Sequence, residues 1–124
     1  MIQTWFFMAW LANAIAAGFE QMAVKDIALA IENGWTPFVL DVRTVEESNI
    51  AKLATTDILI PHNELETRLK EVPRDRDILV YCHSGIRSAN AAKLLKQNGY
   101  KRVVNMSGGI VDWAKTVDPK MKTY

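Results

Sequence analysis

The residues whose types and spacing could do chemistry are consecutive, in the run Cys82-His83-Ser84-Gly85-Ile86-Arg87-Ser88. The run before it, 77–81, is apolar after Asp77 and is typical of a buried parallel strand, and the following run, 88–96, has the pattern of an amphipathic helix. Cys82 is therefore expected at the carboxyl end of a strand, where N–H groups of the loop and the helix N-terminus form a cradle for an anion. Such a cradle, with Arg87 nearby, also stabilises a thiolate, so we expect an ionised, nucleophilic sulfur at neutral pH.

The alternative role for Cys82 is that of a buried, inert residue that fills space in the core. A loop of Gly, Ser and Arg is a poor environment for a packing residue, which favours the reactive thiolate. The chain has 1 cysteine and 2 histidines, too few for an internal disulfide or a four-ligand zinc site. No metal or organic cofactor is expected, and any redox or sulfur chemistry has to pass through Cys82 and an external partner.

Length and charge limit the classes of protein to consider. The 124 residues suit one domain with one core, which we place at residues 19–124. The formal charge is +1, from 15 basic and 14 acidic residues, and Lys and Arg do not cluster along the chain. Nucleic acid is therefore not expected as a partner.

Residues 1–18 form an apolar N-terminal segment without a charged side chain. A signal peptide, a membrane anchor and a helix that packs on the domain or on a second copy of it are all compatible with this composition. The segment lacks the Lys or Arg expected near the start of a signal peptide, and Gln3, Thr4 and Asn13 interrupt it as a membrane span. The protein is thus expected to be cytoplasmic, or to be exported or membrane-anchored if residues 1–18 act as a signal or an anchor. Membrane association or a homodimer through residues 1–18 is a further possibility.

After Phe19 the chain alternates between strand-like and helix-like stretches with short connections, which indicates an α/β domain with helices on both faces of one sheet. Thr44 is a candidate N-cap, and Asn33-Gly34 and Asn98-Gly99 are helix stop signals. The expected strands are 37–42, 57–60, 77–81 and 103–104. The expected helices are 24–32, a short one after Thr44, 63–70, 88–96, and a short one around Trp113.

Three pieces of sequence, in this order, resemble the single-domain type of the rhodanese (sulfurtransferase) family over about residues 19–119. They are Leu40-Asp41-Val42-Arg43 with Glu46 and Glu47, the run 82–88, and Gly108-Gly109-Ile110-Val111-Asp112-Trp113. The resemblance implies a three-layer domain with a central, mostly parallel five-stranded sheet. It also implies that Cys82 carries sulfur as a persulfide and that Arg87 is the loop cation. Residues His83, Ser84, Gly85, Ile86, Arg87 and Ser88 would then bind the substrate, with their backbone N–H groups forming the cradle.

The activity implied by the resemblance is transfer of a sulfane sulfur from a donor such as thiosulfate to cyanide or a thiol, with a glutathione-like or thioredoxin-like acceptor. An alternative is a sulfur-carrier or polysulfide-binding module that acts with a protein partner. A third reading, a cysteine-dependent phosphatase or arsenate reductase, is disfavoured by loop length. Four residues separate Cys82 from Arg87, one fewer than in the related phosphatases, and the shorter ring of N–H groups fits a single sulfur better than a tetrahedral oxyanion.

Some parts of the chain depart from the family pattern or invite other assignments. The segments 49–57 and 117–119 differ from the family's usual sequence, which affects the rim of the pocket and hence substrate preference. Asp41 and Arg43 are expected to form an ion-paired frame at the sheet edge. His83 is expected to line the pocket mouth, because the side chains of adjacent residues usually point apart. Gly108-Gly109 is expected to form a turn that needs positive φ.

Overall fold

The computed structural model describes residues 18–124, so the segment 1–17 and the predictions made for it lie outside the described residues. Five parallel strands form one sheet in the order β1-β5-β4-β2-β3. The strands are β1 (Glu20–Ala23), β2 (Phe38–Asp41), β3 (Ile58–Leu59), β4 (Ile78–Tyr81) and β5 (Val103–Ser107). This confirms the predicted α/β fold with a five-stranded sheet.

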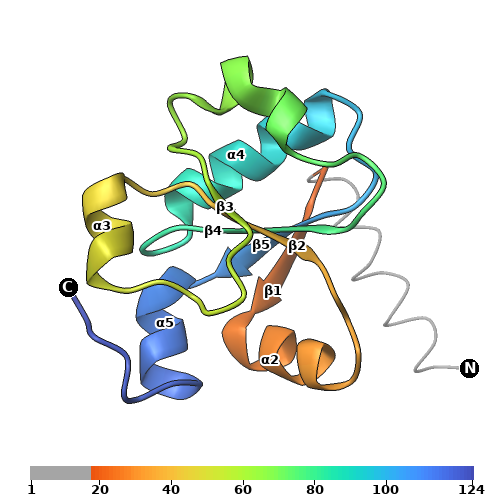
Figure 1. Ribbon diagram of the computed structural model, residues 1–124. Coiled ribbons are helices and arrows are strands. Elements are labelled where there is room, and N and C mark those ends of the chain that lie inside the picture. Colours follow the sequence, from red (N-terminus) through yellow and green to blue (C-terminus); the bar gives the residue numbers. More distant parts are fainter. Residues whose placement is uncertain (1–17) are drawn as a thin grey trace, which may run out of the picture.

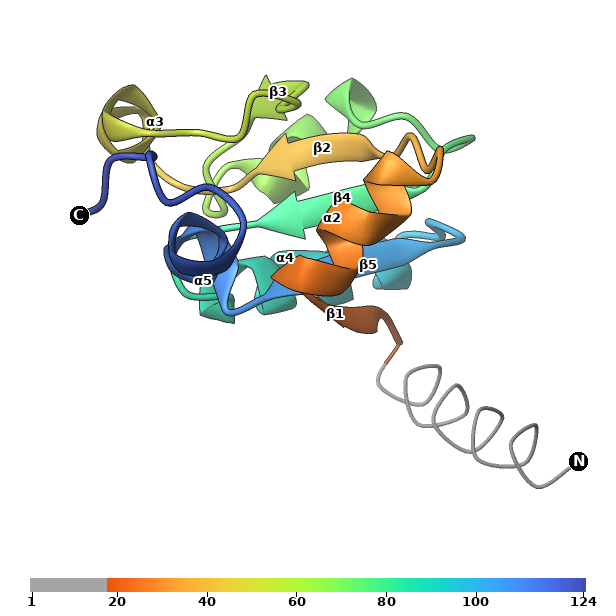
Figure 2. The same ribbon diagram turned by 90° about the horizontal axis from the view of Figure 1, so that it is seen from below.

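Helices cover both faces of the sheet, as Figures 1 and 2 show. One face carries α4 and η1, the other α2 and α5, and α3 lies beyond the carboxyl ends of the strands. Their bounds are α2 (Val24–Glu32), α3 (Val45–Ile50), η1 (Leu65–Glu71), α4 (Ile86–Gln97) and α5 (Gly109–Thr116). Among the described helices, none is long and apolar enough to cross a membrane.

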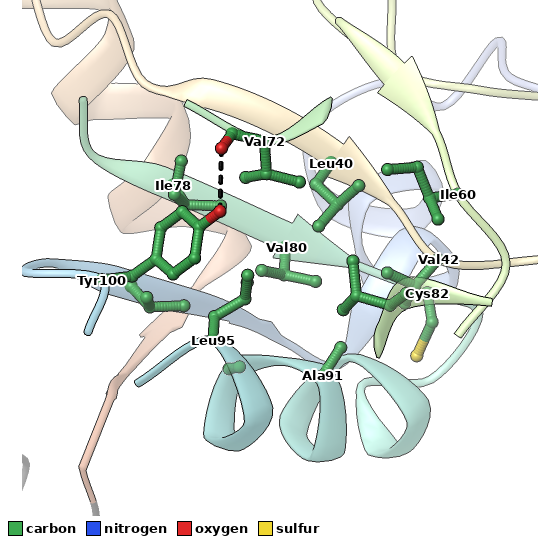
Figure 3. Close-up of a cluster of buried hydrophobic side chains, with 13 residues drawn as sticks. Leu40, Val42, Ile60, Val72, Ile78, Val80, Cys82, Ala91, Leu95 and Tyr100 are labelled. Atoms are coloured by element: carbon green, nitrogen blue, oxygen red, sulfur yellow. Dashed lines mark hydrogen bonds between the residues drawn. The ribbon is translucent and has the colours of Figure 1, made fainter. Parts of the chain in front are cut away.

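Strand β4 lies in the middle of the sheet, and its residues point alternately into two clusters of buried hydrophobic side chains, one on each face of the sheet. Ile78 and Val80 face α4, and Leu79 and Tyr81 face α2 and α5. All four are fully buried, which explains the uninterrupted apolar run in the sequence. Cys82 follows directly, so its position at the carboxyl end of a buried strand is confirmed (Figure 3).

Two elements differ from the sequence-based expectation. Strand β1, at the edge of the sheet, was not predicted, because its four residues Glu-Gln-Met-Ala carry no strand pattern and backbone pairing with Val104 to Ser107 creates it. The helix expected over 63–70 is a 3-10 helix, η1, broken by the non-helical backbone of Arg68. Its apolar residue Leu65 is still buried against the sheet, as the helical spacing indicated.

Candidate active site

The sulfur of Cys82 lies where three hydrogen-bond donors converge. The backbone N–H groups of Gly85 and Ser88 donate to Sγ at 3.1 and 3.4 Å, and the Ser88 hydroxyl donates at 3.3 Å. The Cys82 residue is only 1% exposed, and Ser88 is fully buried. Donors that converge on Sγ in a buried site can stabilise negative charge that develops there, such as that of a thiolate.

The arrangement refines the predicted cradle. The structure directs two of the predicted loop N–H groups at Sγ, those of Gly85 and Ser88. It also adds the Ser88 hydroxyl, which sequence analysis had not considered as a side-chain donor. A serine at the first turn of a helix after a nucleophilic cysteine was the available signal. The same donors speak against Cys82 as an inert packing residue, although its burial is what that alternative required.

The turn of the loop depends on Gly85, which has a φ of 101° and is the N-cap residue of α4. Its carbonyl oxygen accepts a hydrogen bond from the Asn105 side chain at 3.1 Å, and Asn105 also donates to the Gln21 side chain at 2.9 Å. A residue with a side chain would be strained at this φ. Strands β1 and β5 therefore hold the turn that aims the loop at Sγ.

The N-terminus of α5 supports the loop from the other side. The N–H groups of Ile110 and Val111 donate to the carbonyl oxygens of Cys82 and His83, at 3.0 and 3.1 Å. Gly109 has a φ of 64°, and a Cβ there would overlap the carbonyl oxygen of His83. Glycine is required for the positive φ, as predicted for Gly108-Gly109, and also for the close approach to His83, which the structure adds.

Arg87 is paired with Glu47 of α3. Two parallel hydrogen bonds, of 2.7 and 2.8 Å, join the guanidinium to both carboxylate oxygens. The hydrogen bonds from Arg87 are the main cause that lowers the pKa of Glu47 to about 2, so the carboxylate is charged at neutral pH. A capping box between Thr44 and Glu47 fixes the start of α3. The predicted loop cation is therefore present, but its charge is balanced by Glu47, which the sequence had indicated only as part of the first family signature.

Asp41 and Arg43 form the expected ion-paired frame at the end of β2. Both are fully buried, and Arg43 donates to the Asp41 carboxylate through Nε at 2.9 Å and Nη2 at 2.7 Å. Arg43 also donates to the carbonyl oxygen of Ala51 at 2.8 Å, and the Tyr81 hydroxyl donates to Asp41 at 3.1 Å. These bonds satisfy the buried charges and tie the segment after α3 to the sheet.

Tyr124 joins this frame to the loop, a contact that sequence analysis missed. Its hydroxyl accepts a hydrogen bond from Arg43 at 2.9 Å and donates one to Glu47 at 2.8 Å. Its ring lies on that of His83, with 4.3 Å between the ring centroids. Partial burial is the main cause that raises the pKa of Tyr124 to about 12, so the hydroxyl keeps its proton. Figures 1 and 2 show this C-terminal segment running from α5 toward α3.

The remaining predicted loop residues face outward. Ser84 is exposed, and the Ile86 side chain is 71% exposed, an unusual state for an isoleucine. His83 is half-buried and lines a hollow beside the loop, as predicted for a residue at a pocket mouth.

Sequence comparison identifies the family of this chain and several of its relatives. Residues 23–116 match the rhodanese-like domain family. The chain belongs to this family. A sulfurtransferase of Allochromatium vinosum is 44% identical over 78 residues, which cover 62% of this chain and 71% of that protein. The putative sulfur carrier protein YrkF of Bacillus subtilis is 32% identical over 98 residues, 79% of this chain and 52% of YrkF. The chain thus spans only about half the length of YrkF.

Solved structures of rhodanese-like proteins share the fold. A rhodanese-related protein of Thermoplasma volcanium superimposes with a TM-score of 0.72 at 32% identity, covering 80% of this chain and 94% of that one. These similarities support sulfur transfer as the general class of chemistry.

Proposed function

We propose that the Cys82 thiolate takes a sulfane sulfur from a donor such as thiosulfate and passes it to a nucleophilic acceptor, cyanide or a thiol. In the first step Sγ attacks the outer sulfur of thiosulfate, an S–S bond forms, and sulfite leaves with the electron pair of the broken bond. In the second step the acceptor attacks the terminal sulfur of the persulfide, and the electron pair returns to Sγ. The reaction is covalent catalysis in two half-reactions.

The observation that carries this proposal is the convergence of three donors on Sγ. In the proposed reaction Sγ attacks as a thiolate and is regenerated as one when the sulfur leaves, so donors fixed around it would stabilise both the nucleophile and the leaving group. The Ser88 hydroxyl donates without a net charge and therefore does not trap the thiolate as a tight ion pair. Only four residues separate Cys82 from Arg87, one fewer than in the related phosphatases. A shorter ring of N–H groups suits a single sulfur better than a phosphate, which argues against a phosphatase or an arsenate reductase.

Intact-protein mass measurement tests the proposal directly. After incubation with thiosulfate and removal of excess donor, the native chain should gain the mass of one sulfur atom, and a reducing agent should reverse the gain. The Cys82→Ser variant is the matched control and should stay unmodified. If the native chain remains unmodified with both thiosulfate and polysulfide, Cys82 does not carry sulfur in this way.

A second candidate, a sulfur-carrier module that acts with a protein partner, is favoured by two observations. YrkF is described as a putative sulfur carrier, and the exposed Ile86 places an apolar side chain on the active loop, where a partner protein would contact it. Turnover with thiosulfate and small acceptors separates the candidates. Loading of Cys82 without appreciable turnover supports the carrier, and repeated turnover supports the enzyme.

A further inference from the structure

A hollow of about 250 Å³ opens beside the active loop, between α5 and the C-terminal segment. On the loop side the hollow is lined by His83, the residue that follows Cys82 in the chain. Apolar atoms predominate in the remaining lining. The residues that line it with His83 are Ile110, Val111, Ala114, Lys115, Lys122, Thr123 and Tyr124.

The charged side chains that line this hollow are both cationic. Lys115 comes from α5 and Lys122 from the C-terminal segment, and no acidic side chain is among the described residues of the lining. A concave, largely apolar surface with a few charged groups fits a small organic molecule with an apolar body and an anionic group.

The other cation of the site is already neutralised. Arg87 donates two hydrogen bonds to the Glu47 carboxylate, at 2.7 and 2.8 Å, so this pair has no net charge to offer an anionic substrate. Among the residues that line the hollow, Lys115 and Lys122 supply the positive charge for an anionic substrate.

The hollow is held in place relative to the sulfur. The first turn of α5 donates hydrogen bonds to the carbonyl oxygens of Cys82 and His83, so the α5 wall cannot shift without the loop. The Tyr124 wall is fixed by its ring on His83 and by hydrogen bonds with Arg43 and Glu47. The Nδ1 atom of His83 is buried and has no hydrogen-bond partner in the described part of the chain.

We propose that this hollow binds the sulfur acceptor, and that the acceptor is a small organic thiol that carries a carboxylate. The proposal rests on the sulfur-transfer function proposed above. The carboxylate binds at Lys115 and Lys122, and the thiol reaches past His83 to the persulfide on Cys82. The acceptor thiolate then forms a bond to the terminal sulfur, the bond from that sulfur to Sγ breaks with its electron pair left on Sγ, and the acceptor leaves as a persulfide. Charge and sulfur balance, and no oxidant or reductant is needed.

A matched pair of thiols tests the assignment. Native chain loaded with sulfur at Cys82 is mixed with 3-mercaptopropionate or with the uncharged 3-mercapto-1-propanol, and loss of the persulfide is followed by intact mass. The measured quantity is the ratio of kcat/KM for the two thiols, compared between proteins so that the intrinsic reactivity of each thiol cancels.

The ratio should fall about threefold in Lys115→Gln or Lys122→Gln and about tenfold in the double variant, because partly exposed ion pairs contribute modestly. In the native chain it should also decrease as salt concentration rises. The control is Lys101→Gln, an exposed lysine at the opposite, amino end of β5, which should keep the native ratio.

An unchanged ratio in the double variant overturns the proposal, as does an equal fall in Lys101→Gln, which would indicate only the overall charge of the protein. A ratio that does not respond to salt in the native chain also contradicts it. Failure of Cys82 to load with sulfur is a different result, because it refutes the proposed function itself, and the mass measurement before mixing distinguishes the two.

Discussion

In the structure the cation of the active loop is engaged, because Arg87 donates two hydrogen bonds to the carboxylate of Glu47. Glu47→Gln should release Arg87 while retaining an acceptor for the Tyr124 hydroxyl. An anionic donor such as thiosulfate would then meet a free positive charge beside Cys82, and sulfur loading should become faster. The variant should therefore gain activity with thiosulfate, although a charged residue of the site is removed.

The size of the gain follows from the strength of the ion pair. The fall in the pKa of Glu47 from 4.5 to about 2 corresponds to about 3 kcal/mol if it is converted whole. Both side chains keep contact with solvent, at 29% exposure for Arg87 and 18% for Glu47. Solvent screening brings the contribution of the pair to about 1 kcal/mol, which corresponds to about fivefold in kcat/KM for loading by thiosulfate.

The assay is the rate of mass gain at a series of thiosulfate concentrations. The adjacent Glu46, also on α3 and exposed, provides the matched control as Glu46→Gln, which should load at the native rate. A loading rate in Glu47→Gln at or below that of the native chain refutes the reasoning. An equal gain in the Glu46 variant refutes it as well, because net charge alone would then account for the effect.

The other predictions concern the loop and its support. Ser88→Ala removes one of the three donors to the sulfur and should slow loading about tenfold, since a hydrogen bond to an anion contributes more than 1 kcal/mol, and the time course of mass gain measures it. Gly109→Ala should lower the free energy of unfolding by about 3 kcal/mol in urea titration, because the new Cβ overlaps the His83 carbonyl at a positive φ. In the control Gly34→Ala the new Cβ meets nothing within 4 Å, so the free energy of unfolding should fall by only about 1 kcal/mol. Equal losses in the two variants would contradict the close contact at Gly109. The folded-state pKa of Glu47 is depressed, so the stability that its carboxylate contributes is complete above about pH 4.5 and disappears as the pH falls toward 2. The difference in unfolding free energy between the native chain and Glu47→Gln should therefore shrink over that range. A constant difference would show that the charge of the carboxylate is not responsible.

Local sequence was sufficient where the cause of a feature is local. The run 77–81 followed by Cys82 predicted a nucleophile at the carboxyl end of a buried strand, and the spacing to Arg87 predicted a short loop. Gly108-Gly109 predicted a turn that needs positive φ, and both glycines have it. These features depend on side-chain periodicity and on the conformational freedom of glycine, which are readable residue by residue.

Contacts between distant segments required the tertiary structure. Edge strand β1 exists because β5 offers it a partner, and its own four residues give no strand signal. Glu47 and Arg87 are 40 positions apart, and Arg43 and Tyr124 are 81 apart, so only the order of the strands brings each pair together. For this reason the sequence by itself was enough to propose the Cys82 sulfur as the nucleophile. The tertiary structure decided that the neighbouring Arg87 is neutralised by Glu47 and that two lysines line the hollow beside the loop.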